Sequence, residues 1–316
     1  MRYRALGNSG LVVSVAGLGC NNFGRRLDVA ATRAVVDAAI DSGITLLDTA
    51  DIYGGAGQSE EILGEVLEGR WDQVVLATKF GSQGADMGYG PAAGAKGGRA
   101  YIRRAVEQSL RRLRTDHIDL YQIHTPDPHT PIEETLSALD DLVTQGKVRY
   151  IGNSNFTGWM IADADWTSRN EHLSRFVSAQ NNYSLLERRV EHEVTPACSQ
   201  FGLGMLPYFP LASGLLTGKY KRGEAPAEGT RLAAWGPRGA QALNDKNFDR
   251  LEKLSSWAEE RGHDMLELAF AWLLGHPVVS SVIAGATKPE QVAANAATAG
   301  WRLTPQEVEE VTKLAA

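Results

Sequence analysis

The feature that most constrains the fold of this chain is a regular alternation of short apolar runs with amphipathic stretches. Apolar runs predict strands buried on both faces of a sheet, and apolar residues spaced three and four apart predict helices. Strands that alternate with helices in this way are typical of a parallel sheet covered by helices. Eight strands are predicted, at residues 14–20, 44–48, 74–79, 118–124, 148–154, 176–180, 204–210 and 280–285.

Proline and glycine residues mark the ends of the predicted helices. Pro131 stands where one helix begins, and Gly43, Gly69 and Gly146 stand where three helices end. Proline suits the first helical turn and glycine suits the residue after the last one. The clearest helices are predicted at residues 28–43, 59–69, 101–114 and 131–146.

Two architectures fit this alternation, a closed barrel and an open doubly wound sheet. The open sheet usually carries a GxGxxG phosphate-binding turn after its first strand. Gly17, Gly19 and Gly24 occur there in the spacing GLGCNNFG, which is not that turn. Eight strands in 316 residues favour one (β/α)₈ barrel over residues 1–316, with the doubly wound sheet as the alternative.

Composition limits the function classes that fit. The net charge is −6, which argues against a nucleic-acid partner. The two cysteines, Cys20 and Cys198, form no CxxC pair, as expected in a reducing compartment. We find neither the apolar core of a signal peptide nor a run long enough to span a membrane. We therefore expect a cytoplasmic protein without a membrane partner; no pattern indicates its oligomeric state.

Two long insertions interrupt the alternation of strands and helices. Residues 81–98 hold seven glycines, and residues 218–246 are polar with further glycine and proline. Long loops on the carboxyl side of barrel strands usually cover a ligand. We expect both segments to be cofactor or substrate loops, although structural filler is the alternative.

Polar residues end or follow most of the predicted strands. In a barrel the carboxyl ends of the strands converge on one rim, where active sites lie. Each side chain alone has a structural explanation, but a series of them is difficult to attribute to chance. The residues are Asp48, Lys79, His124, Ser154, Asn155, Gln180 and Tyr208.

These residue types fit a reaction that needs a proton donor. Tyr53 lies five residues beyond Asp48, so a loop can bring its phenol over the rim. A free phenol has a pKa of about 10, and a nearby ammonium such as that of Lys79 is expected to lower it. Asp48 would hold Lys79 charged, and His124 could hydrogen-bond a substrate oxygen.

The chain also resembles a known family. The stretches LLDTADIYG, VVLATKFG, IDLYQIHTPDP, YIGNSNF, AQNNYSLLER and YFPLASGLLTGKY are similar to aldo-keto reductase motifs and occur in the family's order. GLLTGKY and GATKPEQV resemble bacterial members related to potassium-channel β subunits. The resemblance implies the catalytic tetrad Asp48, Tyr53, Lys79 and His124.

The resemblance further implies reduction of a small aldehyde or ketone with a nicotinamide cofactor, Tyr53 donating the proton. Ser154, Asn155 and Gln180 would hold the carboxamide, and Tyr208 would stack on the nicotinamide. Other segments would hold the pyrophosphate and adenosine. The implied cofactor-binding residues are Cys20, Asn21, Asp48, Ser154, Asn155, Gln180, Tyr208, Phe209, Pro210, Leu211, Ala212, Gly214, Leu215, Lys219, Arg231, Gly285, Thr287, Lys288, Gln291 and Asn295.

The sequence departs from the family pattern in the adenosine segment. Ala294 stands where many members have glutamate, and Gln291 where many NADP-selective members have arginine. Lys288 or Arg231 could instead pair with a 2′-phosphate, since either cation suits a phosphate dianion. We therefore expect NADP(H) rather than NAD(H).

Two alternatives from other classes remain at this stage. One is a redox-sensing regulatory or binding subunit that uses the same barrel and cofactor. The other is a metal-dependent hydrolase, prompted by His124, Asp127 and His129 in HTPDPH. Metal-dependent barrels usually gather their ligands from several strands, which this cluster does not. We therefore expect no metal and treat His129 as a loop residue.

Overall fold

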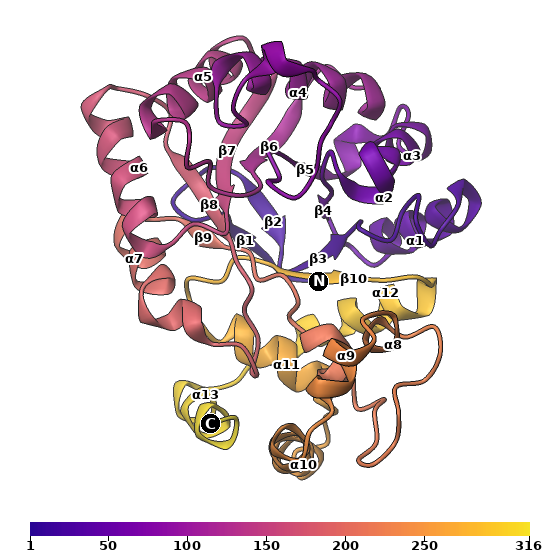
Figure 1. Cartoon of the computed structure of the whole chain (residues 1–316). Coiled ribbons are helices and arrows are strands. Elements are labelled where there is room, and N and C mark those ends of the chain that lie inside the picture. The colour runs from indigo at the N-terminus through magenta and orange to yellow at the C-terminus, as the bar shows by residue number, and fades with distance from the viewer.

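The computed structural model describes residues 1–316, apart from the side chain of Arg238. Eight parallel strands form its main sheet, in the order β10-β3-β4-β5-β6-β7-β8-β9. Helices surround this sheet as an outer layer (Figure 1). The strands are β3 (Ala16–Gly19), β4 (Leu46–Asp48), β5 (Val75–Phe80), β6 (Ile118–Ile123), β7 (Val148–Ser154), β8 (Phe176–Gln180), β9 (Gly204–Met205) and β10 (Val282–Gly285).

The sheet closes on itself between β9 and β10. Met205 forms a parallel bridge with Val279, and Ile283 N donates to Pro207 O at 3.1 Å. The fold is therefore the expected (β/α)₈ barrel. The predicted strand 204–210 is wrong beyond Met205, since Pro207 and Pro210 have no amide hydrogen to give to a ladder.

Two of the predicted helices, α1 and α5, end just before the predicted glycines, whereas α3 ends at Val66, three residues before Gly69. Pro131 precedes α5, and Gly43 and Gly146 take positive φ after α1 and α5. Asp28 caps α1 by accepting from Ala31 N at 2.9 Å. The helices are α1 (Val29–Asp41), α2 (Tyr53–Ala56), α3 (Gln58–Val66), α4 (Arg99–Leu113), α5 (Ile132–Thr144), α6 (Gly158–Asn170), α7 (Val194–Phe201), α8 (Arg231–Ala234), α9 (Pro237–Ala242), α10 (Asp245–Glu259), α11 (Met265–Leu274), α12 (Pro289–Ala297) and α13 (Pro305–Leu314).

A short antiparallel hairpin, which sequence reasoning missed, precedes the barrel. Its strands are β1 (Tyr3–Ala5) and β2 (Val12–Ser14). Leu6, Leu11 and Val13 from the hairpin pack in one buried cluster with inward-facing strand residues such as Leu46 and Leu120. The hairpin therefore contributes to the core inside the barrel, where apolar contact area is the main stabilising term.

Two glycines are required by close approaches of the backbone. Gly7, in the hairpin turn, has φ +57°, and a Cβ there would lie 2.4 Å from Gly202 O. At Gly152, in β7, a Cβ would lie 2.2 Å from Ser178 Oγ. Neither position accepts a larger side chain without movement of its neighbours.

The two insertions differ from the expected plain loops. Residues 218–246 contain α8 and α9 and the start of α10. Arg222 joins this segment to α10 through ion pairs with Asp245, Asp249 and Glu252. Residues 81–98 include a single 3₁₀ turn at Pro91–Ala93. No helix among the described residues is long and apolar enough to cross a membrane.

Candidate active site

A cavity of about 830 Å³ opens at the carboxyl ends of the barrel strands. Asp48 at the end of β4, Gln180 at the end of β8 and Gly285 at the end of β10 all line it. His124 follows β6, and Tyr53 is the first residue of α2. The expected convergence of strand ends on one site is thus present.

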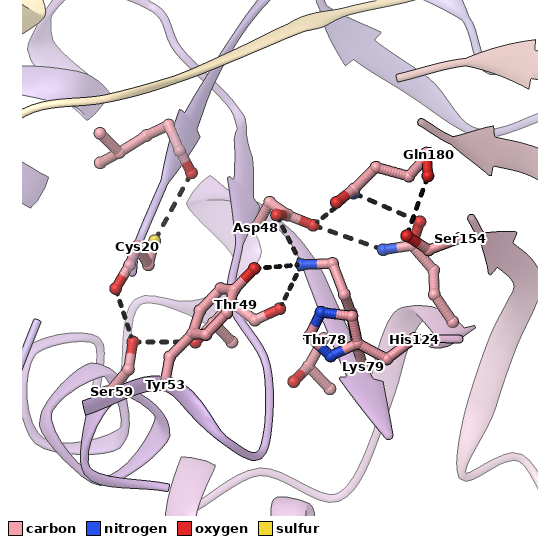
Figure 2. Close-up of polar contacts among 12 residues, drawn as sticks. Cys20, Asp48, Thr49, Tyr53, Ser59, Thr78, Lys79, His124, Ser154 and Gln180 are labelled. Carbon is pink, nitrogen blue, oxygen red and sulfur yellow. Dashed lines mark hydrogen bonds and ion pairs between the residues drawn. The ribbon is translucent and has the colours of Figure 1, made fainter. Parts of the chain in front are cut away.

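Lys79 is buried at the centre of a group of hydrogen-bonded residues (Figure 2). Its Nζ atom is 2.7 Å from Asp48 Oδ2 and 2.8 Å from the Thr49 carbonyl oxygen. The same ammonium donates to Tyr53 Oη at 3.4 Å. Lys79 is fully buried, so this ion pair is shielded from water and a hydrogen-bonded chain leads from Asp48 through Lys79 to the phenol.

Electrostatics keep Lys79 charged. Burial acts to lower the pKa of Lys79, but the Asp48 carboxylate and the Tyr53 hydroxyl outweigh it and the pKa is raised. The site therefore holds a fixed positive charge beside Tyr53, as expected from the sequence.

The expected low pKa of Tyr53 is wrong for the protein alone. Burial raises the pKa of Tyr53 above its usual value and Asp48 adds to this, while Lys79 acts in the opposite direction. Tyr53 is accordingly a neutral phenol that carries the proton it would donate. The Lys79 ammonium still acts in the direction that would favour a phenolate at this position.

His124 stands beside Tyr53 as a neutral imidazole. The two ring centroids are 5.9 Å apart and the rings meet edge to face at 82°. Burial, with a smaller contribution from Lys79, lowers the pKa of His124 to about 3. His124 thus offers a neutral N–H group, suited to orienting an oxygen rather than to transferring a proton.

The predicted carboxamide residues form part of the same network. Gln180 Nε2 donates to Asp48 Oδ1 at 2.9 Å, and Ser154 Oγ donates to the Gln180 carbonyl oxygen at 2.9 Å. Tyr208 Oη donates to Asn155 Oδ1 at 2.8 Å. These hydrogen bonds fix the side chains at the cavity wall, while each residue still lines the cavity.

Three cationic side chains, Arg26, Lys219 and Arg231, line another part of the cavity and are called the cationic wall below. Arg26 donates to the Gly229 carbonyl oxygen at 2.8 Å, across the gap between the β3–α1 loop and the 218–246 segment. Lys219 and Arg231 lie over the rings of Tyr220 and Phe209. The charges therefore rest on a carbonyl and ring faces rather than on carboxylates, which suits an anionic ligand. Burial, and then Arg26, lower the pKa of Arg231.

Most of the predicted cofactor residues are brought together in this cavity. Those that line it are Asn21, Asp48, Ser154, Asn155, Gln180, Tyr208, Phe209, Pro210, Leu211, Gly214, Lys219, Arg231, Gly285, Thr287, Gln291 and Asn295. Their individual binding roles stay predictions.

Four predicted cofactor residues are absent from the described cavity lining. Cys20 and Leu215 are buried in the apolar core. Ala212 packs against that core, because the chain turns sharply there with positive φ. Lys288 is exposed at the amino end of α12. All four residues lie outside the strands, where the chain turns and a neighbour in sequence can face away from the site.

Several lining residues were not named singly from the sequence, although they lie in loops 21–27 and 218–246, which were expected to form pocket walls. Arg26 lies in the loop after the first barrel strand, and Glu228, Gly229 and Thr230 precede Arg231 in the long insertion. Their position in carboxyl-side loops was a usable signal. Residues 81–98 are absent from the described lining, so the expectation that this loop covers the ligand has no support.

In the HTPDPH stretch, Asp127 accepts hydrogen bonds that hold the loop before α5. Asp127 accepts hydrogen bonds from Gly97 N, His129 N and Thr130 Oγ1, at 2.6, 3.0 and 2.8 Å. These contacts dock residue 97 onto the loop before α5. The Asp127 carboxylate is thus engaged away from His124, which lines the cavity.

Comparison with known proteins agrees with this geometry. The sequence model of the Aldo/keto reductase family matches residues 16–316. The chain belongs to this family. An uncharacterized oxidoreductase of Bacillus subtilis (strain 168), YrpG, is 42% identical over 92% of this chain and 89% of its own. A probable voltage-gated potassium channel subunit beta of Oryza sativa subsp. japonica is 36% identical over 93% and 90%. The L-glyceraldehyde 3-phosphate reductase of Escherichia coli (strain K12) is 34% identical over 93% and 86%.

Membership of the Aldo/keto reductase family indicates what kind of protein this is. The aldo/keto reductases are oxidoreductases that generally use NADH or NADPH. The resemblance seen in the sequence is therefore confirmed, both to the family and to relatives named as channel β subunits. The cationic wall of the cavity fits such a dinucleotide, because its pyrophosphate is anionic.

Proposed function

We propose that this aldo/keto reductase reduces small aldehydes or ketones with NADPH and that Tyr53 donates the proton. The observation that carries the proposal is the chain Asp48–Lys79–Tyr53, which ends with the phenol at the wall of a cavity suited to a dinucleotide. The reduced nicotinamide, when bound, supplies hydride to the carbonyl carbon.

The protein's residues would act on the substrate oxygen. Tyr53 transfers its proton to the oxygen as negative charge develops there, and Lys79 stabilises the phenolate that is left. Asp48 keeps Lys79 charged throughout, because removal of that carboxylate would leave a buried ammonium unpaired. His124 donates its N–H to the same oxygen and fixes the direction of the carbonyl group.

Binding of the cofactor would use the two sides of the cavity. We assign Gln180, Asn155 and Ser154, which line the cavity, to hydrogen bonding of the carboxamide, and the ring of Tyr208 to stacking on the nicotinamide. Arg231, Lys219 and Arg26 would meet the phosphates. The cationic excess of this wall favours NADPH, which carries one more phosphate than NADH.

A screen of NADPH oxidation over aldehydes, ketones, quinones and dicarbonyl compounds tests the proposal. A reductase should oxidise NADPH in proportion to added substrate and form the corresponding alcohol. The E. coli relative's name makes a phosphorylated aldehyde one useful member of the panel. Binding of NADPH without turnover of any carbonyl compound would contradict the proposed activity.

The second candidate is a regulatory subunit that senses the cofactor's redox state. It is favoured by the 36% identity to the rice protein named as a probable channel subunit beta. On that alternative, reduced and oxidised cofactor bind with different affinities while catalytic turnover stays negligible. Measuring both affinities together with the turnover separates the two candidates.

A further inference from the structure

A second group of buried polar side chains lies behind the tetrad, on the side of the sheet that faces α3 and α4. Asp51 is fully buried, and neither carboxylate oxygen has a hydrogen-bond partner among the described side chains. Asp51 N donates to the Lys79 carbonyl oxygen at 3.1 Å, so its backbone is tied to the strand that carries Lys79. The six-residue segment from Asp48 to Tyr53 thus carries a third acidic or phenolic group that the mechanism does not use.

The Arg112 guanidinium, which acts on Asp51, is already paired with another carboxylate. Arg112 Nε donates to Glu60 Oε2 at 2.8 Å, and Thr78 Oγ1 donates to Glu60 Oε1 at 2.5 Å. Glu60 is fully buried and has both oxygens satisfied. Asp51 therefore has no paired cation, and an isolated buried carboxylate is costly in free energy. Such a group is stabilised by binding a proton.

Three phenols complete the cluster. The hydroxyl groups of Tyr89, Tyr101 and Tyr121 are buried and lack partners among the described residues. Burial raises the pKa of Tyr101 and of Tyr121, and the Asp51 carboxylate is the next largest cause of the increase in each. The hydroxyls therefore lie within electrostatic reach of Asp51. A carboxyl group among neutral hydroxyls can both donate and accept hydrogen bonds when it is protonated.

The surroundings of Asp51 as a whole also favour its protonated form. Burial and then Glu60 raise its pKa to about 7, against the opposing effects of Arg112, the backbone N–H of Ile52 and Lys79. Glu60 from α3, Arg112 from α4 and Lys79 from β5 act on the pKa of Asp51 through their charges. Burial, and then the Asp51 carboxylate, in turn raise the pKa of Tyr89 in the 81–98 loop, Tyr101 in α4 and Tyr121 in β6.

We propose that Asp51 is a proton-binding positioning residue that sets the charge behind Lys79 and Tyr53. The protonated carboxyl leaves Lys79 free to stabilise the phenolate of Tyr53. Ionised Asp51 adds a negative charge near Lys79, weakens its effect on Tyr53 and makes Tyr53 a poorer acid. The second consequence rests on the proposed reductase function, whereas the proton site itself does not.

Thermal unfolding of Asp51→Asn against pH tests the proton site without any assay of activity. The folded protein holds this proton up to about pH 7, whereas the unfolded chain releases it near the ordinary value of 3.8. Wild-type stability therefore falls as pH rises between these values, and levels off above them. Asparagine keeps the shape without the charge, so the Tm advantage of Asp51→Asn should grow from pH 4 to pH 7 and then stay constant.

A control variant and a spectroscopic measurement accompany the unfolding experiment. Asp72→Asn removes an exposed carboxylate in the 71–73 turn and should show no such growth with pH. Infrared difference spectra of the wild type should show a protonated carboxyl band at pH 5.5 that is lost by pH 8.5. A Tm difference independent of pH, failure of Asp51→Asn to fold, or absence of the band would each overturn the proposal.

The pH dependence of single-turnover reduction tests the link to Tyr53. Wild-type reduction should slow by about threefold to tenfold as pH rises through 7, because the added charge acts at short range in a poorly solvated site. The rate of Asp51→Asn should not fall as pH rises through 7, and at pH 6 it should equal the wild-type rate. A fall in rate that persists in Asp51→Asn would show that Asp51 does not act on Tyr53. No reduction by either protein would count against the reductase function and leave the unfolding and infrared results unaffected.

Discussion

Lys79 and Asp48 form a fully buried ion pair, with 2.7 Å between Nζ and Oδ2, at the carboxyl end of neighbouring barrel strands. Gln180 and Gln122 donate to the other carboxylate oxygen of Asp48, so both partners are held in place. A pair of this kind stabilises the fold less than its short distance implies, because both charges have lost their hydration. Its main effect is to keep a positive charge beside Tyr53.

Removal of one partner of this ion pair should be costly. Lys79→Met leaves Asp48 charged and buried, and we expect it to lower the free energy of unfolding by about 3–5 kcal/mol. Urea unfolding of the single variants and of Lys79→Met/Asp48→Asn measures this. The double variant should be more stable than Lys79→Met alone. Additive losses would show that the two side chains are not coupled.

The neutral state of His124 predicts a specific acid sensitivity. Its pKa is lowered to about 3 in the folded protein, against 6.5 in the unfolded chain. The unfolded state therefore binds a proton that the folded state excludes, and stability falls as pH drops from about 6.5 towards 3. His124→Asn should lose less stability over this range than the wild type. Parallel Tm curves for the two proteins would contradict the assignment.

The cationic wall should discriminate between nicotinamide cofactors. We expect NADPH to bind more tightly than NADH when protein fluorescence is titrated. Arg231→Gln should weaken both cofactors if Arg231 meets the pyrophosphate, and NADPH alone if it meets the 2′-phosphate. Arg231 lies over the ring of Phe209, and both residues line the cavity.

The Lys288→Gln variant completes this comparison. Lys288 is exposed and absent from the described cavity lining, so its replacement should change NADPH affinity less than Arg231→Gln does. A larger loss at Lys288 would place the 2′-phosphate at the start of α12. Equal affinity of the wild type for NADPH and NADH would contradict the NADP(H) proposal.

Cofactor binding should protect one insertion more than the other. Lys219 and Arg231 in residues 218–246 line the cavity, whereas residues 81–98 are absent from the described lining. Charge-assisted hydrogen bonds from Lys219 and Arg231 to the cofactor would offset the entropy lost when residues 218–246 are fixed. Amide hydrogen exchange with saturating NADPH should slow across 218–231 and change little across 81–98. Unchanged exchange across 218–231 would exclude this role.

The fold was largely predictable because apolar runs and glycine and proline signals are local. Pro131 and Gly146 bracket α5 as the sequence predicts. The β1–β2 hairpin was missed because its alternation is short, and because the contact of Leu6 and Val13 with the barrel core joins distant parts of the chain. The seventh predicted strand was too long for a local reason, because Pro207 and Pro210 have no amide hydrogen to donate to a ladder.

The site was predictable wherever chemistry lies at a strand end. Asp48, Lys79 and His124 follow that rule, but it says nothing about the direction of a side chain in a loop. Cys20 follows β3 directly and yet turns into the core. Asp51, which lies between two tetrad residues, was missed because its buried neighbours come from helices and strands far away in the sequence.

The most direct measurement of the central claim is single-turnover reduction of a non-activated aldehyde by Tyr53→Phe. The variant lacks only the hydroxyl that lies 3.4 Å from Lys79 Nζ, so NADPH affinity, measured by fluorescence, should be retained. Loss of a general acid should slow the chemical step by at least about 100-fold. A Tyr53→Phe enzyme that keeps more than roughly a tenth of the wild-type rate would contradict the assignment of Tyr53 as proton donor.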